Sequence, residues 1–312
     1  MDLISIIVAV YNAENTLEKC LNSLLEQTYK NTEIIVVNDC SKDNSLKICQ
    51  ELAAVHSNIV VISNEKNCGV SATRNRGIEA SNGDFICFID SDDYVDQNYL
   101  EVLHKYAVEY DTVPICGFVF HNIFENKPDQ IYSWGNDSEK LQLGRIFELY
   151  KCVYLGALWN KLFDCNKVKS HNIKFDETLS LGEDLRFSLE YFEKNNLSYV
   201  YVLSDTLYHY LKLSDNTLMS KYSKSGIESG IENLRLTKDI AKKYNPKADA
   251  LFEESVKTLK DNMIYFTMTD KKYSKKQKLE KIRELSPNFS NNDYIKMKIS
   301  FVKEKIYDII KG

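Results

Sequence analysis

Four polar residues stand immediately after the apolar run Phe85 to Ile89: Asp90, Ser91, Asp92 and Asp93. The carboxylates of Asp90 and Asp92 could bind a metal. Two carboxylates separated by one residue suit a hard divalent cation, because Mg²⁺ and Mn²⁺ take one or two carboxylates together with substrate phosphate oxygens. A metal held there would neutralise a diphosphate leaving group. The same four residues would also suit an acidic turn after a strand, and the short motif alone does not separate these interpretations.

A second acidic pair, Glu183 and Asp184, opens a predicted helix that runs to about Lys194. Transfer of a group to a hydroxyl needs a general base, and a carboxylate in a partly closed site can serve as one. Acidic residues at a helix N-terminus are also favoured by the helix macrodipole. The pair therefore allows a catalytic role, a structural role, or both.

Two further groups allow either a site role or a core role. His209 stands between two tyrosines, and its neutral imidazole could complete a metal site or lie half-buried in a strand. Trp159, Asn160 and Lys161 form a compact aromatic and polar cluster that could line a ligand pocket. A core tryptophan on a helix explains the same segment equally well.

The elements that must position these residues alternate between strand and helix. Apolar runs predict strands at Ile4–Val10, Glu33–Val37, Ile59–Ile62 and Phe85–Ile89, with helical spacing between them, and a further short strand at Tyr199–Val202. This alternation predicts βαβ units and a mostly parallel sheet, whose strand carboxyl ends meet at one ligand-binding edge. Tyr11, Asn12, Asp39 and the acidic run from Asp90 all follow predicted strands, so we expect them at that edge.

The common glycine-rich phosphate-binding motifs are absent from the sequence. The turn after the first predicted strand contains Tyr11, Asn12 and Glu14 in place of a Gly-x-Gly-x-x-Gly motif, and no Walker A sequence occurs. The phosphates of a nucleotide would therefore have to be held by a metal, by Arg or Lys, or by both.

The assembled pattern resembles the family 2 glycosyltransferases, which have the GT-A fold. The segments that carry the resemblance are Ser5–Asn12 with Glu14, Val36–Ser45, Asn67–Gly77, Gly83–Asp93, Trp159–Phe163 and Gly182–Asp184. The resemblance is dense over residues 1–100, patchy to about residue 215, and not evident beyond. It implies an α/β protein with a GT-A type, Rossmann-like, mostly parallel sheet flanked by helices, followed here by a C-terminal helical extension.

The resemblance also implies a binding site for a nucleotide-diphosphate sugar, most simply a UDP-sugar. The positions that match its nucleotide site are Val10, Tyr11, Asn12, Glu14, Asp39, Arg74, Asp90 and Ser91. Asp39 matches the residue that hydrogen-bonds the pyrimidine base, and a carboxylate there can accept the uracil N3–H. Arg74 matches a residue that reaches the base or the diphosphate. One departure is Cys40, which replaces the usual glycine and lacks its freedom at positive φ.

The same resemblance assigns the reaction and its metal. Asp92 matches the principal ligand of Mn²⁺ or Mg²⁺, with Asp90 and His209 as further candidate ligands. Asp184 matches the general base, and Glu183 matches a neighbour that orients the acceptor or the loop. Trp159, Asn160 and Lys161 could line the pocket for the acceptor or the donor sugar, since an aromatic face packs well against a sugar ring. The implied reaction is an inverting single displacement that moves a hexosyl or N-acetylhexosaminyl group to a hydroxyl of a glycan or lipid-linked saccharide.

Two alternative functions remain open at this point. A nucleotidyltransferase that makes a nucleotide-sugar could use the same fold, but it usually needs a basic, glycine-rich loop that the sequence lacks. A non-catalytic module that binds a glycan or a nucleotide would not need the acidic residues at every expected site.

Charge divides the chain near residue 220. The net charge is -5, with an acidic excess over residues 1–220 and a basic, lysine-rich remainder. We expect a catalytic domain at 1–220, with a nucleotide-binding half at 1–100 and an acceptor-binding half at 101–220, and a helical region at 221–312. The acidic catalytic part argues against nucleic acid as a partner.

The end of the chain predicts an amphipathic helix. Apolar residues recur at helical spacing from Ile295 to Ile310, with lysines between them. This helix could lie on an anionic membrane surface, or pack on its own chain or a second subunit. No apolar run approaches the ~18 residues of a membrane span, no basic signal-peptide start is present, and the 8 cysteines form no CxxC pair. We expect reduced thiols and a cytoplasmic protein, free or at the inner face of the cell membrane.

Overall fold

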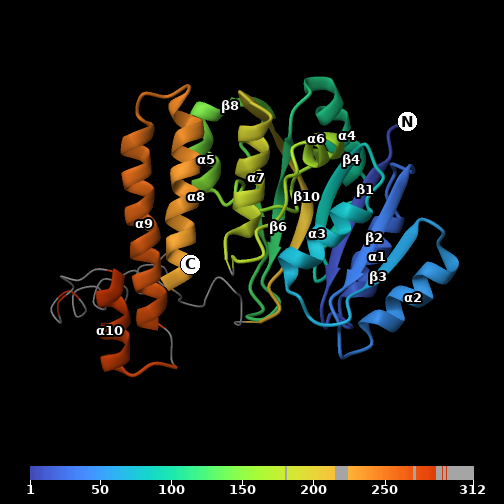
Figure 1. The fold of residues 1–312 in the computed structure, drawn as a ribbon, viewed down its shortest axis with the longest axis horizontal. Coiled ribbons are helices and arrows are strands. Elements are labelled where there is room, and N and C mark those ends of the chain that lie inside the picture. The colour runs from blue at the N-terminus through green and yellow to red at the C-terminus, as the bar shows by residue number, and fades with distance from the viewer. Residues whose placement is uncertain (180, 215–223, 270–271, 286–289, 291–292, 294–312) are drawn as a thin grey trace.

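The computed structural model describes residues 1–179, 181–214, 224–269, 272–285, 290 and 293 (Figure 1). The strands are β1 (Ile4–Val10), β2 (Thr32–Asn38), β3 (Ile59–Ser63), β4 (Phe85–Asp90), β5 (Tyr94–Val95), β6 (Pro114–His121), β7 (Gln130–Tyr132), β8 (Glu139–Gln142), β9 (Phe163–Asp164) and β10 (Tyr199–Leu211). The helices are α1 (Leu17–Leu25), α2 (Ser45–Val55), α3 (Val70–Ala80), α4 (Tyr99–Tyr110), η1 (Leu143–Arg145), α5 (Ile146–Lys151), α6 (Cys165–Ser170), α7 (Glu183–Lys194), α8 (Lys224–Lys242), α9 (Ala248–Thr269) and α10 (Lys275–Leu285).

The first sheet has the order β3-β2-β1-β4-β9. Its first four strands are parallel, and only β9 runs antiparallel, to β4. The central strands β1 and β2 are almost continuous runs of buried, mostly β-branched residues, as expected when helices cover both faces of a parallel sheet. The mostly parallel α/β sheet is therefore confirmed, and its four parallel strands match the predicted ranges within about one residue at each end.

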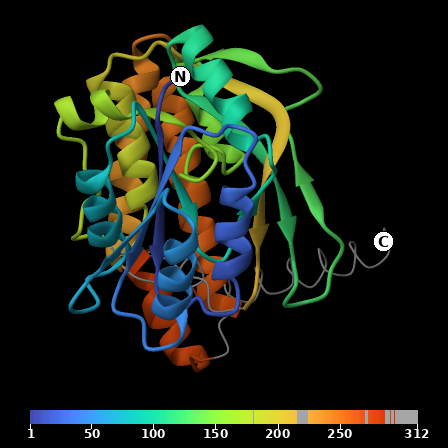
Figure 2. The same ribbon diagram turned by 90° about the vertical axis from the view of Figure 1, so that its right-hand side faces the viewer.

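Helices cover this sheet on both faces. Figure 2 shows α1 and α2 in front of the sheet, and α1 buries Leu17, Cys20, Leu21 and Leu24 on one side. On α3, a Cβ added at Gly77 would lie 2.6 Å from the Ile7 side chain, so only glycine permits this close approach of helix and strand. The carboxyl ends of β1, β2 and β4 are thereby held rigidly at one edge.

The second sheet is organised by β10, which differs from its prediction. The sequence predicted a short strand at Tyr199–Val202, whereas β10 spans 13 residues and continues through Tyr208 and His209. It pairs parallel with β6 and antiparallel with β5 and β8, with irregular register between Val202 and Thr206. Polar Ser204 and Asp205 lie at this irregularity, which is why the apolar pattern is interrupted there although the strand goes on.

The helices after residue 223 pack against the rest of the molecule. α8 lies against α7, α5 and η1, and α9 packs on α8 (Figure 1). Leu234, Ile240 and Ala241 of α8 belong to the same buried cluster as the sheets. The predicted amphipathic helix from Ile295 to Ile310 lies outside the described residues. In the described part of the chain, no helix is both long and apolar enough to cross a membrane.

Candidate active site

The acidic loop, which we define as Asp90 at the end of β4 together with Ser91, Asp92 and Asp93, is anchored by Asp93. This side chain is buried, its Oδ2 accepts a hydrogen bond of 2.7 Å from the Tyr208 hydroxyl, and its Oδ1 accepts one of 2.8 Å from the Leu211 backbone N–H. Burial and the neighbouring Asp92 and Asp90 raise the pKa of Asp93 well above its ordinary value. The sequence does not indicate this anchoring role of Asp93, because its partners lie more than 100 residues away along the chain.

Asp92, unlike the buried and hydrogen-bonded Asp93, is exposed to solvent. Its side chain has no hydrogen-bond or cationic partner in the described part of the molecule. The surrounding protein excludes enough water, and Asp90 lies close enough, to raise the pKa of Asp92 to about 6. A carboxylate without a counter-charge of its own, close to a second carboxylate, fits a divalent cation. Among the described residues no group of three or more His, Cys, Asp or Glu side chains converges on one point, so such an ion would also need ligands from the substrate.

Arg74 of α3 joins the acidic loop to the start of α7. Its Nη2 donates to Asp90 Oδ1 at 2.8 Å and its Nη1 donates to Asp184 Oδ1 at 2.6 Å, while Glu183 Oε1 lies 3.9 Å from Nη1. The guanidinium is 5% exposed, so these ion pairs are shielded from water. The structure thus brings together four of the predicted site residues, with Arg74 engaged by carboxylates. Its predicted contact with the base or diphosphate stays a prediction.

Asp184 has the protonation behaviour that a general base requires. Burial raises its pKa to about 7, against the opposing effect of Arg74 and with further upward contributions from Glu183 and Asp90. Its Oδ1 is occupied by Arg74, and Oδ2 has no hydrogen bond to any residue that the structure describes. The side chain keeps 24% of its surface exposed. One oxygen is therefore held while the other remains open to a substrate.

Asp39 lies at the carboxyl end of β2 and is nearly buried. Its Oδ1 accepts hydrogen bonds from Asn64 Nδ2 and the Cys68 backbone N–H, both at 2.8 Å, and its Oδ2 accepts one of 2.9 Å from the Gly69 backbone N–H. These donors fix the carboxylate at the N-terminus of α3. Each carboxylate oxygen has two lone-pair directions, so Oδ2 retains capacity for one more donor. The predicted base contact of Asp39 stays a prediction.

The turn after β1 forms the wall beside Asp39. Val10 is buried and its carbonyl accepts from the Asp39 N–H, whereas Tyr11 is 48% exposed and free to meet a planar ligand. Asn12 Oδ1 accepts from the Lys42 backbone N–H, and Glu14 Oε2 accepts from the Asn44 backbone and side chain. Asn12 and Glu14 therefore tie this turn to the start of α2.

Cys40 adopts a backbone conformation that glycine takes more readily than other residues. Its φ is +57°, in the left-handed region where a side chain usually costs about 1 kcal/mol. Cys40 is therefore strained at the position where the resemblance predicts a glycine.

Trp159, Asn160 and Lys161 are all buried. The ring of Trp159 stacks on Tyr208 with centroids 4.1 Å apart. Asn160 and Lys161 have no exposed surface, and the Lys161 ammonium donates to the carbonyls of Tyr154, Leu155 and Ala157 and to Asn160 Oδ1. Burial lowers the pKa of Lys161 to about 7. The hydrogen bonds of Asn160 and Lys161 brace the turn before β9. The predicted place of the three residues in the acceptor or sugar pocket stays a prediction.

His209 lies in a stack on the β5 side of the second sheet. Its Nε2 bonds to Asp96 Oδ1 and its Nδ1 to His121 Nε2, both at 2.9 Å, and its ring stacks on Tyr94 with centroids 4.2 Å apart. Both ring nitrogens thus already have protein partners. The structure does not bring His209 together with Asp90 and Asp92, and its predicted metal role stays a prediction.

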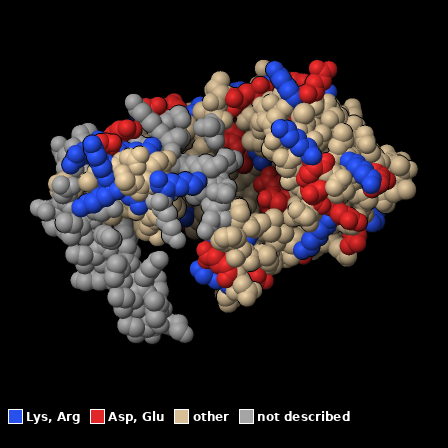
Figure 3. Space-filling model, turned by 90° about the horizontal axis from the view of Figure 1, so that it is seen from below, with Lys and Arg blue, Asp and Glu red and all other residues tan. Residues whose placement is uncertain are grey.

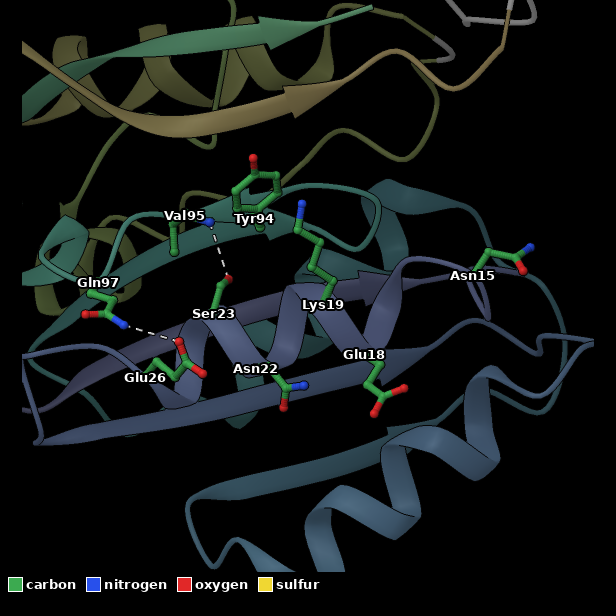
Figure 4. Close-up of a pocket in the computed structure, with 9 residues that line it drawn as sticks. All are labelled: Asn15, Glu18, Lys19, Asn22, Ser23, Glu26, Tyr94, Val95 and Gln97. Atoms are coloured by element: carbon green, nitrogen blue, oxygen red, sulfur yellow. Dashed lines mark hydrogen bonds between the residues drawn. The ribbon is translucent and has the colours of Figure 1, made fainter. Parts of the chain in front are cut away.

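An open cavity of about 540 Å³ lies between α1 and β5 (Figure 4). Lys19 and Tyr94 face each other there, with the ammonium 3.3 Å from the ring centroid. The cavity contains none of the predicted site residues. Seen from below, the molecule instead shows Asp and Glu side chains around a separate central hollow (Figure 3).

The sequence is similar to known glycosyltransferases, and the fold is similar to that of a solved structure. Residues 5–161 match the family model described as Glycosyl transferase family 2. The chain is 36% identical over 233 residues to the putative glycosyltransferase EpsH of Bacillus subtilis, covering 73% of this chain and 66% of EpsH. It is 37% identical over 194 residues to the glycosyltransferase GlyA of Streptococcus pneumoniae, covering 59% of this chain and 27% of GlyA. The chain thus spans less than two thirds of the length of these relatives.

A solved structure of S. aureus TarS residues 1–349 in complex with UDP-GlcNAc has the same fold. The TM-score is 0.61 at 22% sequence identity, and the alignment covers 90% of this chain and 71% of that one. At this identity the likeness shows the fold alone.

Proposed function

Because the chain belongs to glycosyl transferase family 2, we propose that it moves a sugar from a UDP-sugar to a hydroxyl of a glycan or of a lipid-linked saccharide. The proposed reaction is a single displacement with inversion, in which the acceptor hydroxyl attacks the anomeric carbon and UDP leaves. The similarity to the glycosyltransferases EpsH and GlyA supports sugar transfer, and the UDP-GlcNAc bound to TarS is the reason to test UDP-sugars first.

The observation that carries this proposal is the pairing made by Arg74. One buried guanidinium fixes Asp90, on the side where the leaving group would lie, and Asp184, on the side where the acceptor would lie. An inverting displacement needs these two functions on opposite sides of one carbon. Asp184, with one open oxygen and a pKa of about 7, can accept the hydroxyl proton near neutral pH.

Asp92 and Asp90 are the residues that would hold Mg²⁺ or Mn²⁺. When bound, the ion would supply positive charge to the diphosphate as it leaves. Asp39 and the exposed Tyr11 would receive the uracil of the donor. Arg74 would hold Asp184, the general base, in place.

The test is a screen of nucleotide sugars with Mn²⁺ that measures UDP release. Asp92→Ala and Asp184→Asn should each lower transfer at least a hundredfold, since each removes a function that no neighbour replaces. Asp249→Asn is the control, because Asp249 is an exposed carboxylate on α9 that pairs with Lys238 and Lys242, away from the proposed site. Transfer at the wild-type rate in both site variants would disprove the assigned roles. Release of pyrophosphate from a nucleoside triphosphate would instead favour a nucleotidyltransferase.

A further inference from the structure

The general base of the proposed reaction depends on an unusual turn. Asp184 is the second residue of α7, and the helix is preceded by Gly182 with φ +85°. A side chain at residue 182 would be strained by this φ alone. The direction in which Asp184 leaves the helix is therefore set by how firmly the turn at Leu181 and Gly182 is held.

That turn is held by α8, from outside the part of the chain that resembles the family. Asn233 is fully buried; its Nδ2 donates to the Gly182 carbonyl at 2.8 Å, and its Oδ1 accepts from Arg186 Nε at 2.7 Å. The hydroxyl of Ser229, one turn earlier on α8, lies 2.9 Å from the Leu181 carbonyl oxygen and 3.0 Å from that of Gly226, and can donate to either. Two consecutive carbonyls of the turn thus lie within hydrogen-bond distance of one helix face.

The fit between Asn233 and Gly182 is close. A Cβ added at residue 182 would lie 2.9 Å from Asn233 Nδ2, so the amide occupies the space that a side chain would need. Asn233 bonds the turn with its amide nitrogen and the first helical turn of α7 with its amide oxygen. It therefore fixes the turn and the helix relative to each other, with Asp184 between them.

We propose that Asn233 is a positioning residue for Asp184, acting through the Gly182 turn. This inference rests on the proposed function, because it assumes that Asp184 is the base. Without Asn233, the Gly182 carbonyl keeps the hydrogen bond of 3.0 Å from the Arg186 backbone N–H but loses its side-chain donor, and the Arg186 Nε–H loses its acceptor, so the turn can shift. A displacement of about 1 Å at a reacting group can cost up to a hundredfold in rate.

The experiment compares Asn233→Ala with Asn245→Ala. Asn245 is a matched control, because its Nδ2 also donates to a glycine carbonyl, that of Gly144, at 2.8 Å, and also joins the region after residue 221 to the rest of the chain. We expect Asn233→Ala to lower kcat at least tenfold while the Kd for UDP and the donor KM change less than about twofold. Asn245→Ala should leave kcat within about twofold of the wild type.

Two further measurements separate positioning from general damage. In an Asp184→Asn background, Asn233→Ala should cause no additional loss of kcat, because both act through one group. Asn233→Asp, which can still accept from Arg186 but cannot donate to Gly182, should resemble Asn233→Ala. Equal losses of kcat in the Asn233→Ala and Asn245→Ala variants, or full activity of Asn233→Asp, would overturn the proposal.

Hydrogen exchange keeps the inference testable without turnover. Amide exchange across residues 181–186 should accelerate in Asn233→Ala, or in Ser229→Ala if that variant is the better folded, and not in Asn245→Ala. Unchanged exchange would contradict the inference. Failure of the wild-type protein to transfer any sugar would count against the proposed function, and the exchange result would still decide whether Asn233 holds the turn.

Discussion

Arg74 illustrates how single charges are balanced at this site. One guanidinium contacts three carboxylates, those of Asp90, Glu183 and Asp184, and Asp92 adds a further carboxylate that has no cation among the described residues. The site therefore carries more negative than positive charge when all four are ionised. Such an excess raises carboxyl pKa values and favours a bound cation. Both effects suit the proposed reaction.

The pH dependence of kcat follows from Asp184. Only its ionised form can accept a proton, so a pKa raised to about 7 means that kcat should increase about tenfold per pH unit below about 7 and level off above it. The profile should be measured with saturating metal ion, because Asp92 has a pKa raised to about 6 and would otherwise contribute. A limb near pH 4 would show that Asp184 is not the titrating base.

The sequence predicted where the candidate site residues lie better than it predicted which residues they contact. Asp39, Asp90 and Asp92 follow strand ends, and any residue there must reach the ligand-binding edge of a parallel sheet. Burial depends instead on what distant segments place around a side chain, so the enclosure of Lys161 by backbone carbonyls and the pairing of His209 with His121 left no signal in their own neighbourhoods.

Among the elements, β10 is longer and pairs with more strands than the short apolar run in its sequence indicates. It is the central strand of the second sheet, and Tyr208 on it reaches across to the acidic loop. The strand that pairs with β5 at Tyr208 thus also holds Asp93. β10 and the loop after β4 should behave as one unit.

Tyr208→Phe tests this link. Loss of the hydroxyl leaves a buried carboxylate oxygen of Asp93 without its donor, which should lower the free energy of unfolding by about 1–3 kcal/mol. Denaturant unfolding would measure this change. Tyr199→Phe is a comparison, because the Tyr199 hydroxyl donates instead to the Tyr110 carbonyl, away from the acidic loop. A larger decrease in metal-dependent activity for Tyr199→Phe than for Tyr208→Phe would contradict the link.

At the scale of the whole molecule, the boundary near residue 220 is clear in the sequence, but buried side chains pack across it. Charge and family resemblance both change there, and we retain 1–220 and 221–312 as proposed regions. The two share buried side chains, however, because Leu234 of α8 is fully buried in the cluster that includes the sheets. Amphipathic spacing predicts that a helix has a buried face, but it does not identify the surface that covers it.

Leu234→Ala should therefore destabilise the whole protein. Truncation of a fully buried leucine costs about 2–5 kcal/mol, and a shared core predicts one cooperative transition at a lower temperature. Calorimetry would measure it, with Leu213→Ala at an exposed leucine as the control. Two separate transitions, with only the smaller one shifted, would show that the C-terminal helices unfold independently.

The stacking of Trp159 on Tyr208 gives the protein an optical reporter. The chain has two tryptophans, and the other, Trp134, donates to Glu139 at the start of β8. Trp159 touches Tyr208, Tyr208 holds Asp93, and Asp93 is adjacent to Asp92. In a Trp134→Phe protein, the remaining indole emission should respond when an ion or a nucleotide occupies the acidic loop, so that occupancy could be followed by fluorescence without any labelled ligand.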